Sequence, residues 1–296
     1  MDALIERKGS TAARPKPQLL FILGISRTGS KFYMQLLNTH REVSILPELL
    51  FQHPMRRCLE RDLRRHLSGS PDPESVLEFV RSQRYKDTYV ESVGKLEGDE
   101  FVAQLKQATG TTTLNVLRAI VRAAGRGCRI AGAKFPVHYS QGGRILSELP
   151  ASRIIYLTRD PRDIYCSDLV MKTRRFRASA FLSVARALLA PFLLVYTVLK
   201  WKHSLWLYRR WEAMFGKDRI ELFRYESIAA DCLGAARSIA GFVGVDPADL
   251  DLDAVRTMDS SFSDGAFGPR WKSSLNFVER AAFNLLGAAR LRNYDC

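Results

Sequence analysis

The chain has 296 residues, of which 46% are hydrophobic, so it can bury a full core and is expected to be globular. Its net charge of +14 indicates an anionic partner, either a nucleic acid, a membrane surface or an acidic small molecule. The five cysteines are scattered and never spaced as C-x-x-C, which argues against a disulfide framework or a zinc site and favours a reducing compartment.

The first segment, residues 1–17, carries charges and prolines without an apolar run. It predicts a flexible leader with no secretory signal, so the expected location is the cytoplasm. Residues 18–296 are expected to form one domain. Within it, apolar runs rich in β-branched residues predict four buried parallel strands, at residues 19–24, 129–135, 152–160 and 219–226.

Helical patterns separate these strands. They cover residues 30–40, 73–83, 99–108, 113–125, 142–150 and 163–176, and a last amphipathic pattern covers residues 276–296. Strand alternating with helix predicts an α/β fold with a single doubly wound, mainly parallel sheet flanked by helices. Ligands of such sheets bind at the carboxyl ends of the strands.

An apolar helical insertion is predicted at about residues 176–212. The run approaches the roughly 20 apolar residues of a membrane span, but Arg186 and Pro191 interrupt it and basic residues follow. Three interpretations remain: a buried helix pair, a surface that touches lipid or a lipophilic substrate, or a true span.

The segment GISRTGSK, residues 24–31, lies between the first strand and the next helix. Such a turn binds anions, because free backbone N–H groups and the helix dipole converge there. A nucleoside-triphosphate loop places Lys and then Ser or Thr after its last Gly, whereas here Ser30 precedes Lys31. A kinase of the P-loop type is therefore an alternative that lacks the usual magnesium ligand, and an ordinary turn is a second alternative.

Cations stand at the predicted strand ends. A kinase of the P-loop type would place its magnesium-binding carboxylate at the end of this strand, where Asp160 stands. Arg159 comes directly before Asp160 and would bring a positive charge close to the metal ion. Together with Arg27, Lys31 and Lys134, it could neutralise a polyanion without a metal ion. The residues thus favour a metal-free site for a phosphate compound.

Two motifs carry a family resemblance. RTGSK, from Arg27 to Lys31, resembles the 5′-phosphosulfate loop R-S-G-T-T of sulfotransferases that use 3′-phosphoadenosine 5′-phosphosulfate (PAPS), with Lys31 departing from the usual Thr. RDPRDIYCS, residues 159–167, resembles their 3′-phosphate segment R-D-P-R-D-x-x-x-S. GAKFPVHY, LFRYESI and FGPRWKSSL follow in the family's order. From about residue 18 to about residue 280, the chain looks like a PAPS-dependent sulfotransferase of the bacterial or tyrosylprotein-type branch, which implies a P-loop-like fold.

The resemblance implies roles for individual residues. PAPS is the implied co-substrate, and no metal is required. The 5′-phosphosulfate would be bound by Arg27, Thr28, Gly29, Ser30 and Lys31, the leaving oxygens by Lys134, the 3′-phosphate by Arg159 and Ser167, and the adenosine side by Tyr225, Arg270, Trp271 and Lys272. Tyr225 and Trp271 could equally be core aromatics, and Lys134 a solvated lysine. For Asp160, Arg162 and Asp163 we expect a salt-bridged corner between strand and helix.

The general base is expected to be Glu48. Cytosolic sulfotransferases have a His two residues after the comparable Lys, but here that position is Pro136, and His138 comes two residues later. Tyrosylprotein and many bacterial enzymes use a Glu after the first helix, where Glu48 follows a predicted short strand. Apolar neighbours suit a carboxylate to base catalysis by raising its pKa. His138 and, less well, His53 are the alternatives.

The acceptor is expected to carry a hydroxyl group. The apolar insertion and its basic flanks suggest a lipophilic alcohol or an acceptor at the inner membrane surface, with peripheral membrane contact, while glycan and peptide acceptors stay open. A nucleic-acid binder is a lesser alternative, since the basic clusters are explained equally well by solvated helix faces. No nucleic acid partner is expected.

Overall fold

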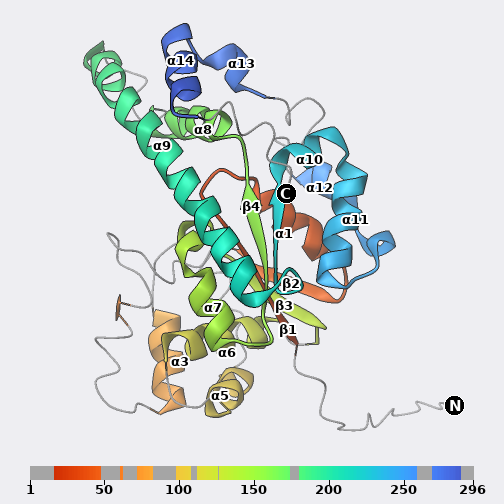
Figure 1. Ribbon diagram of the computed structural model, residues 1–296. Helices are drawn as coiled ribbons and strands as arrows, with labels where there is room; N and C mark the ends of the chain where they lie inside the picture. The colour runs from red at the N-terminus through yellow and green to blue at the C-terminus, as the bar shows by residue number, and fades with distance from the viewer. Residues whose placement is uncertain are drawn as a thin grey trace, which may run out of the picture.

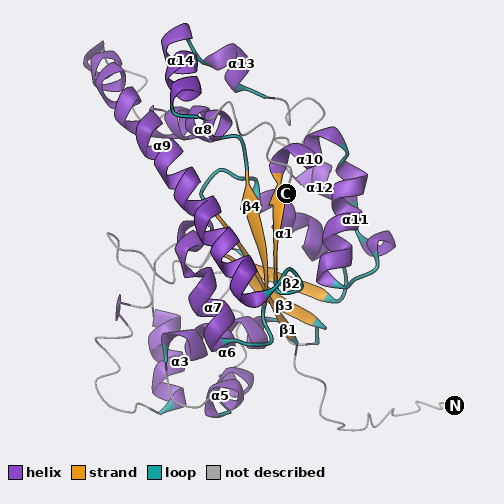
Figure 2. Ribbon diagram, in the orientation of Figure 1, coloured by secondary structure: helices purple, strands orange, loops and turns teal. Residues whose placement is uncertain are grey.

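The computed structural model describes residues 17–47, 61–62, 72–82, 98–107, 112–125, 127–173, 180–258 and 269–287. In this part, five strands form one parallel sheet in the order β2-β3-β1-β4-β5 (Figures 1 and 2). The strands are β1 Gln18–Gly24, β2 Val43–Leu46, β3 Ile130–Lys134, β4 Arg153–Thr158 and β5 Ile220–Arg224. The four predicted strands and the short strand before Glu48 are confirmed, as is the parallel sheet.

The described part also contains helices, some of which cover the two faces of the sheet. They are α1 Ser30–Thr39, α3 Pro73–Ser82, α5 Gly98–Lys106, α6 Thr113–Ala124, α7 Gly142–Glu148, α8 Pro161–Thr173, α9 Ala180–Phe215, α10 Tyr225–Ala230, α11 Cys232–Val243, α12 Leu252–Met258, α13 Trp271–Ser274 and α14 Phe277–Leu285, with 3₁₀ turns η1 Pro136–Gln141 and η3 Pro247–Asp249. The predicted helical patterns correspond to described helices, although residues 174–176 and 288–296 of the last two patterns lie outside the described residues, as does the predicted leader up to residue 16. Four helices, α10 to α13, were not predicted.

Alternate residues of the central strand build two cores. Leu19, Phe21 and Leu23 belong to a cluster with α6 and α7, whereas Leu20 and Ile22 belong to a cluster with α1 and α11. A strand sends successive side chains to opposite faces, so an unbroken apolar run is what a sheet covered on both sides requires. Figure 1 shows α6 and α7 on one side of the sheet and α1 and α11 on the other.

The interpretation of the insertion as a helix pair is wrong, because residues 180–215 form one continuous helix, α9, with Pro191 inside it. Proline removes one backbone hydrogen bond, but the helix continues through Pro191, which is exposed. The other side of α9 packs on the body of the protein through buried Trp201, Leu205, Tyr208 and Trp211. No helix in the described ranges has the length and hydropathy that crossing a membrane requires.

Candidate functional site

The loop after β1 closes onto Tyr225. Gly29 caps α1 with a φ of 83°, and a Cβ placed on it would lie 2.3 Å from Tyr225 Cδ2. The buried Thr28 hydroxyl donates to the carbonyl of Ile25 at 2.9 Å, which stabilises the turn. Ser30 and Lys31 are the first two residues of α1, so the loop delivers the N–H groups of a helix N-terminus to the carboxyl edge of the sheet.

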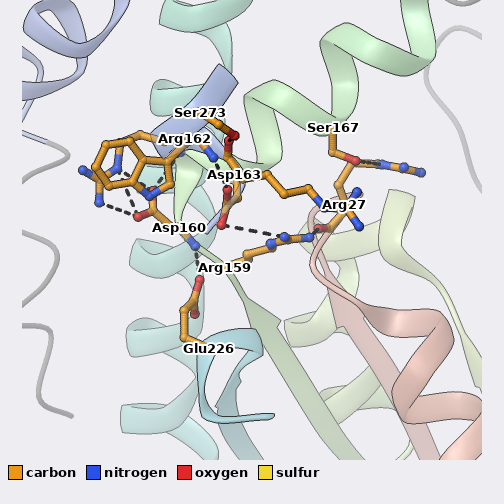
Figure 3. Close-up of polar contacts among 10 residues, drawn as sticks. Arg27, Arg159, Asp160, Arg162, Asp163, Ser167, Glu226 and Ser273 are labelled. Carbon is orange, nitrogen blue, oxygen red and sulfur yellow. Dashed lines mark hydrogen bonds and ion pairs between the residues drawn. The ribbon is translucent and has the colours of Figure 1, made fainter. Parts of the chain in front are cut away.

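Arg27 joins the two motifs that the sequence singled out. It is the one non-glycine residue with positive φ in the described chain, at 76°, and its Nε donates to Ser167 Oγ at 2.7 Å (Figure 3). Ser167 lies on α8, 140 residues away in sequence. The predicted 5′ loop and the predicted 3′ segment therefore meet at one place.

Arg159 is nearly buried between three groups. Its guanidinium carbon lies 4.0 Å from the centroid of the Tyr225 ring, Nη2 lies 3.7 Å from the Asp163 carboxylate, and Nη1 donates to the Arg27 carbonyl at 3.4 Å. Its Nε, also buried, has no hydrogen-bond partner within the described residues. A buried charged N–H without an acceptor is costly, so the charge of Arg159 is only partly compensated within the described residues.

The predicted salt-bridged corner is confirmed. The Asp160 carboxylate accepts two hydrogen bonds from Arg162 Nε, at 2.9 and 3.1 Å, and Asp163 pairs with Arg159. Glu226 accepts the backbone N–H of Asp160 at 2.6 Å. Burial raises the pKa of the Asp163 carboxyl above its usual value, against the opposing effects of a hydrogen bond from the Trp271 N–H and the charge of Arg159.

The start of α13 lies against this corner. The Trp271 N–H donates to Asp163 Oδ1 at 3.0 Å, and the Arg162 guanidinium carbon lies 3.7 Å from the centroid of the Trp271 ring. Burial raises the pKa of Tyr225, while the nearby charges of Arg159 and then Arg270 lower it. Of the predicted late residues, Trp271 contacts the corner, and the charge of Arg270 lies near Tyr225. Lys272 is exposed, and its carbonyl accepts a hydrogen bond from Arg280.

Lys134 ends β3 at the same edge of the sheet. It pairs in register with Ile22, two residues before Gly24, and is partly exposed. The predicted base Glu48 and its alternative His53 lie outside the described residues. His138 falls in η1, but its side chain is outside the described part. The structure therefore places Lys134 and leaves the base a prediction.

Trp201 is a site-supporting residue that the sequence did not reveal. Its Nε1 donates to the Arg159 carbonyl at 3.0 Å, and its buried ring packs with Ile25 and Ile164. The apolar insertion thereby packs against both predicted phosphate motifs. In the described ranges, no three His, Cys, Asp or Glu side chains are grouped so that they could hold a metal ion.

Comparisons with known proteins agree with this fold. Residues 17–249 match the sequence model of the sulfotransferase family. The sulfotransferase STF9 from Mycobacterium avium is similar at 17% identity and a TM-score of 0.54, over 95% of this chain and 78% of that one. The sulfotransferase domain of the Synechococcus PCC 7002 olefin synthase is similar at 19% identity and a TM-score of 0.52, over 97% and 98%.

No curated protein matched the chain. At such low identities the two solved structures show the fold, whereas the family match extends over most of the residues. The chain therefore belongs to the sulfotransferase family, and its general reaction is the transfer of a sulfuryl group.

Proposed function

We propose that the protein transfers a sulfuryl group from PAPS to a hydroxyl of its acceptor by in-line displacement, with no metal required. The acceptor oxygen forms a bond to sulfur while the bond from sulfur to the bridging oxygen breaks. The leaving group, 3′-phosphoadenosine 5′-phosphate (PAP), takes the electron pair, and the acceptor proton passes to a general base. As in phosphoryl transfer, the protein contributes positioning and charge stabilisation.

The observation that carries this proposal is the meeting of the two phosphate motifs. Arg27 reaches Ser167 at 2.7 Å, and Arg159 reaches the Arg27 carbonyl, so cations and helix N–H groups face one region from two segments. A donor with phosphate groups on both sides of its ribose needs two anion subsites at fixed separation. We assign the 5′-phosphosulfate to Arg27, Lys31 and the loop from Thr28 to Ser30, and the 3′-phosphate to Arg159 and Ser167.

The adenosine would lie between Tyr225 and the start of α13. Tyr225 already stacks on Arg159 and borders Gly29, so its ring joins both subsites. Arg270, Trp271 and Lys272 would cover the adenosine and the 3′-phosphate.

Lys134 would stabilise the charge that develops on the leaving oxygens, because it ends the strand beside the 5′ loop. A Lys134→Ala variant should lose turnover by about a hundredfold or more while PAP affinity falls much less. Glu48 is the proposed base, with His138 and His53 as alternatives. A Glu48→Gln variant that retains full transfer activity would remove Glu48 from this role.

Transfer of sulfur from radiolabelled PAPS into separated lipid, glycan and protein pools tests the donor and finds the acceptor class together. Calorimetry with PAPS, PAP and Mg-ATP supplies the control. Binding of Mg-ATP in preference to PAP would favour a kinase and refute the proposal.

For the acceptor, we propose a lipophilic alcohol presented at an anionic membrane surface, on the inner face of the cytoplasmic membrane. The support is one face of α9, where Phe192, Val195, Tyr196, Leu199 and Trp206 are exposed at helical spacing. Exposed basic residues flank them at Lys202, Arg209 and Arg210. Apolar and aromatic residues bordered by basic ones are typical of helices that lie in a membrane interface.

Flotation with vesicles of neutral or partly anionic lipid tests this part. The protein should float with the anionic vesicles, and a Phe192→Ser/Leu199→Ser variant should remain at the bottom. Flotation of that variant at the wild-type level would contradict the membrane assignment without affecting the donor.

A further inference from the structure

Asp163 contacts two segments that are distant in sequence. It stands in the first turn of α8 with 5% of its surface exposed, and its Oδ1 accepts the backbone N–H of Trp271 at 3.0 Å. Its Oδ2 lies 3.7 Å from Arg159 Nη2 (Figure 3). One carboxylate thus joins the start of α13, 108 residues away, to the end of β4.

The same corner also binds the Trp271 ring. Arg162 stacks on that ring at 3.7 Å, and the Asp160 carboxylate accepts hydrogen bonds from the N–H edge of the same guanidinium. Trp271 is therefore bound through its backbone by Asp163 and through its ring by Arg162. The segment from residue 269 to 274 consequently depends on the corner for its place.

Asp163 also determines how Arg159 is oriented. A guanidinium is planar, so contacts to one face and one edge fix the directions of its remaining N–H groups. Tyr225 covers the face at 4.0 Å, and Asp163 is the carboxylate that pairs with the edge in the described part of the chain. The Asp163 contact, at 3.7 Å, is an ion pair and not a hydrogen bond, and the hydrogen bond to the Arg27 carbonyl is itself long, at 3.4 Å. Because the ion pair joins two full charges that are both buried, it acts on the guanidinium more strongly than the neutral carbonyl does.

We propose that Asp163 is a positioning residue that orients Arg159 toward the 3′-phosphate and holds the segment at Trp271, so that an oriented Arg159 and a docked segment occur together. This inference rests on the proposed function, in which Arg159 binds the 3′-phosphate. The direction in which the affinity for the phosphate ligand changes, when the charge of Asp163 is removed, shows whether orientation matters. If orientation did not matter, removing a negative charge beside a phosphate would tighten binding.

The test compares PAP with adenosine 5′-monophosphate (AMP), which lacks the 3′-phosphate, by calorimetry. Asp163→Asn keeps an acceptor oxygen for the Trp271 N–H but loses the charge that pairs with Arg159. It should weaken PAP binding roughly tenfold, the size of one charge-assisted contact, and change AMP binding by less than about twofold. Asp218→Asn, at an exposed turn, is the matched control and should change neither affinity.

Hydrogen exchange of the peptide 269–275 reports the second role. It should stay slow in Asp163→Asn and become faster in Asp163→Ala, which loses the acceptor as well. If Asp163→Ala fails to fold, Asp163→Asn still decides the point.

Unchanged or tighter PAP binding in Asp163→Asn would overturn the inference, and so would an equal loss for PAP and AMP, since that indicates a general structural defect. A wild-type protein without preference for PAP over AMP is a different result, because it contradicts the assignment of Arg159 and with it the proposed function.

Discussion

Gly29 offers a quantitative test of how the 5′ loop is held. An added Cβ would lie 2.3 Å from Tyr225 Cδ2 and 2.7 Å from Cε2, and the backbone φ is 83°. In Gly29→Ala, the left-handed conformation costs about 1–2 kcal/mol, and the forced contact with the ring costs about 1–3 kcal/mol. A total near 3 kcal/mol lowers the melting temperature by about 6–12 °C in a domain of this size.

The assay is thermal and urea unfolding of Gly29→Ala in two backgrounds. In a Tyr225→Ala background the ring is gone, so Gly29→Ala should cost only the backbone part, and the cycle should give a coupling of about 1–3 kcal/mol. Gly241→Ala is the control, because no atom lies within 4 Å of the added Cβ and the site is inside α11. It should stabilise the protein by up to about 1 kcal/mol. Equal costs of Gly29→Ala in both backgrounds would refute the argument from the ring contact.

Three further predictions concern stability and the support of the site. Arg219 donates to three backbone carbonyls within residues 146–152, so Arg219→Lys should lose about 1–3 kcal/mol in urea unfolding, and a wild-type midpoint would contradict it. Burial raises the pKa of Cys166 from its ordinary 9.0 to about 12. The folded thiol keeps its proton where the unfolded one ionises, so the free energy of unfolding should fall as pH rises above 9, and Cys166→Ala should make that fall less steep. Trp201→Phe removes the donor to the Arg159 carbonyl and should weaken PAP binding more than AMP binding in calorimetry, whereas an equal change would argue for a general packing effect.

The strands could be predicted because a sheet covered on both faces leaves continuous apolar runs. The helix α11 could not, since its sequence contains Gly234 and Gly241, which lower helix propensity, and its clearest signal is the cap at Asp231, whose side chain accepts the Gly234 N–H at 2.8 Å. Pro191 suggests a break because a proline inside a helix removes a backbone hydrogen bond and clashes with the carbonyl four residues earlier, yet α9 continues through it. Tertiary packing of the buried side of α9 overrides this local preference.

The contacts in the site also fall into two groups, those that the local sequence predicts and those that only tertiary packing brings together. The ion pairs of residues 159–163 are local, so their charge pattern predicted the corner correctly. The bond from Trp271 to Asp163 and that from Trp201 to Arg159 join segments 108 and 42 residues apart, and nothing in the local sequence marks either partner. Contacts of this kind are set by the packing of whole helices.

The arrangement of the strands brings the two predicted phosphate motifs to one edge of the sheet. β1 and β4 are hydrogen-bonded neighbours, with Gly24 opposite Leu157, so the loops that follow them start about 5 Å apart at the same edge. Arg27 and Arg159, which follow these strands, would repel each other without an anion. Here Ser167 accepts from Arg27, while Asp163 and the Tyr225 ring offset the charge of Arg159. These contacts compensate the charges of Arg27 and Arg159 only in part, whereas a ligand with two phosphate groups could pair with both. The added charge pairing would make a nucleoside bisphosphate bind more tightly than a nucleotide with phosphate on one side of the ribose only.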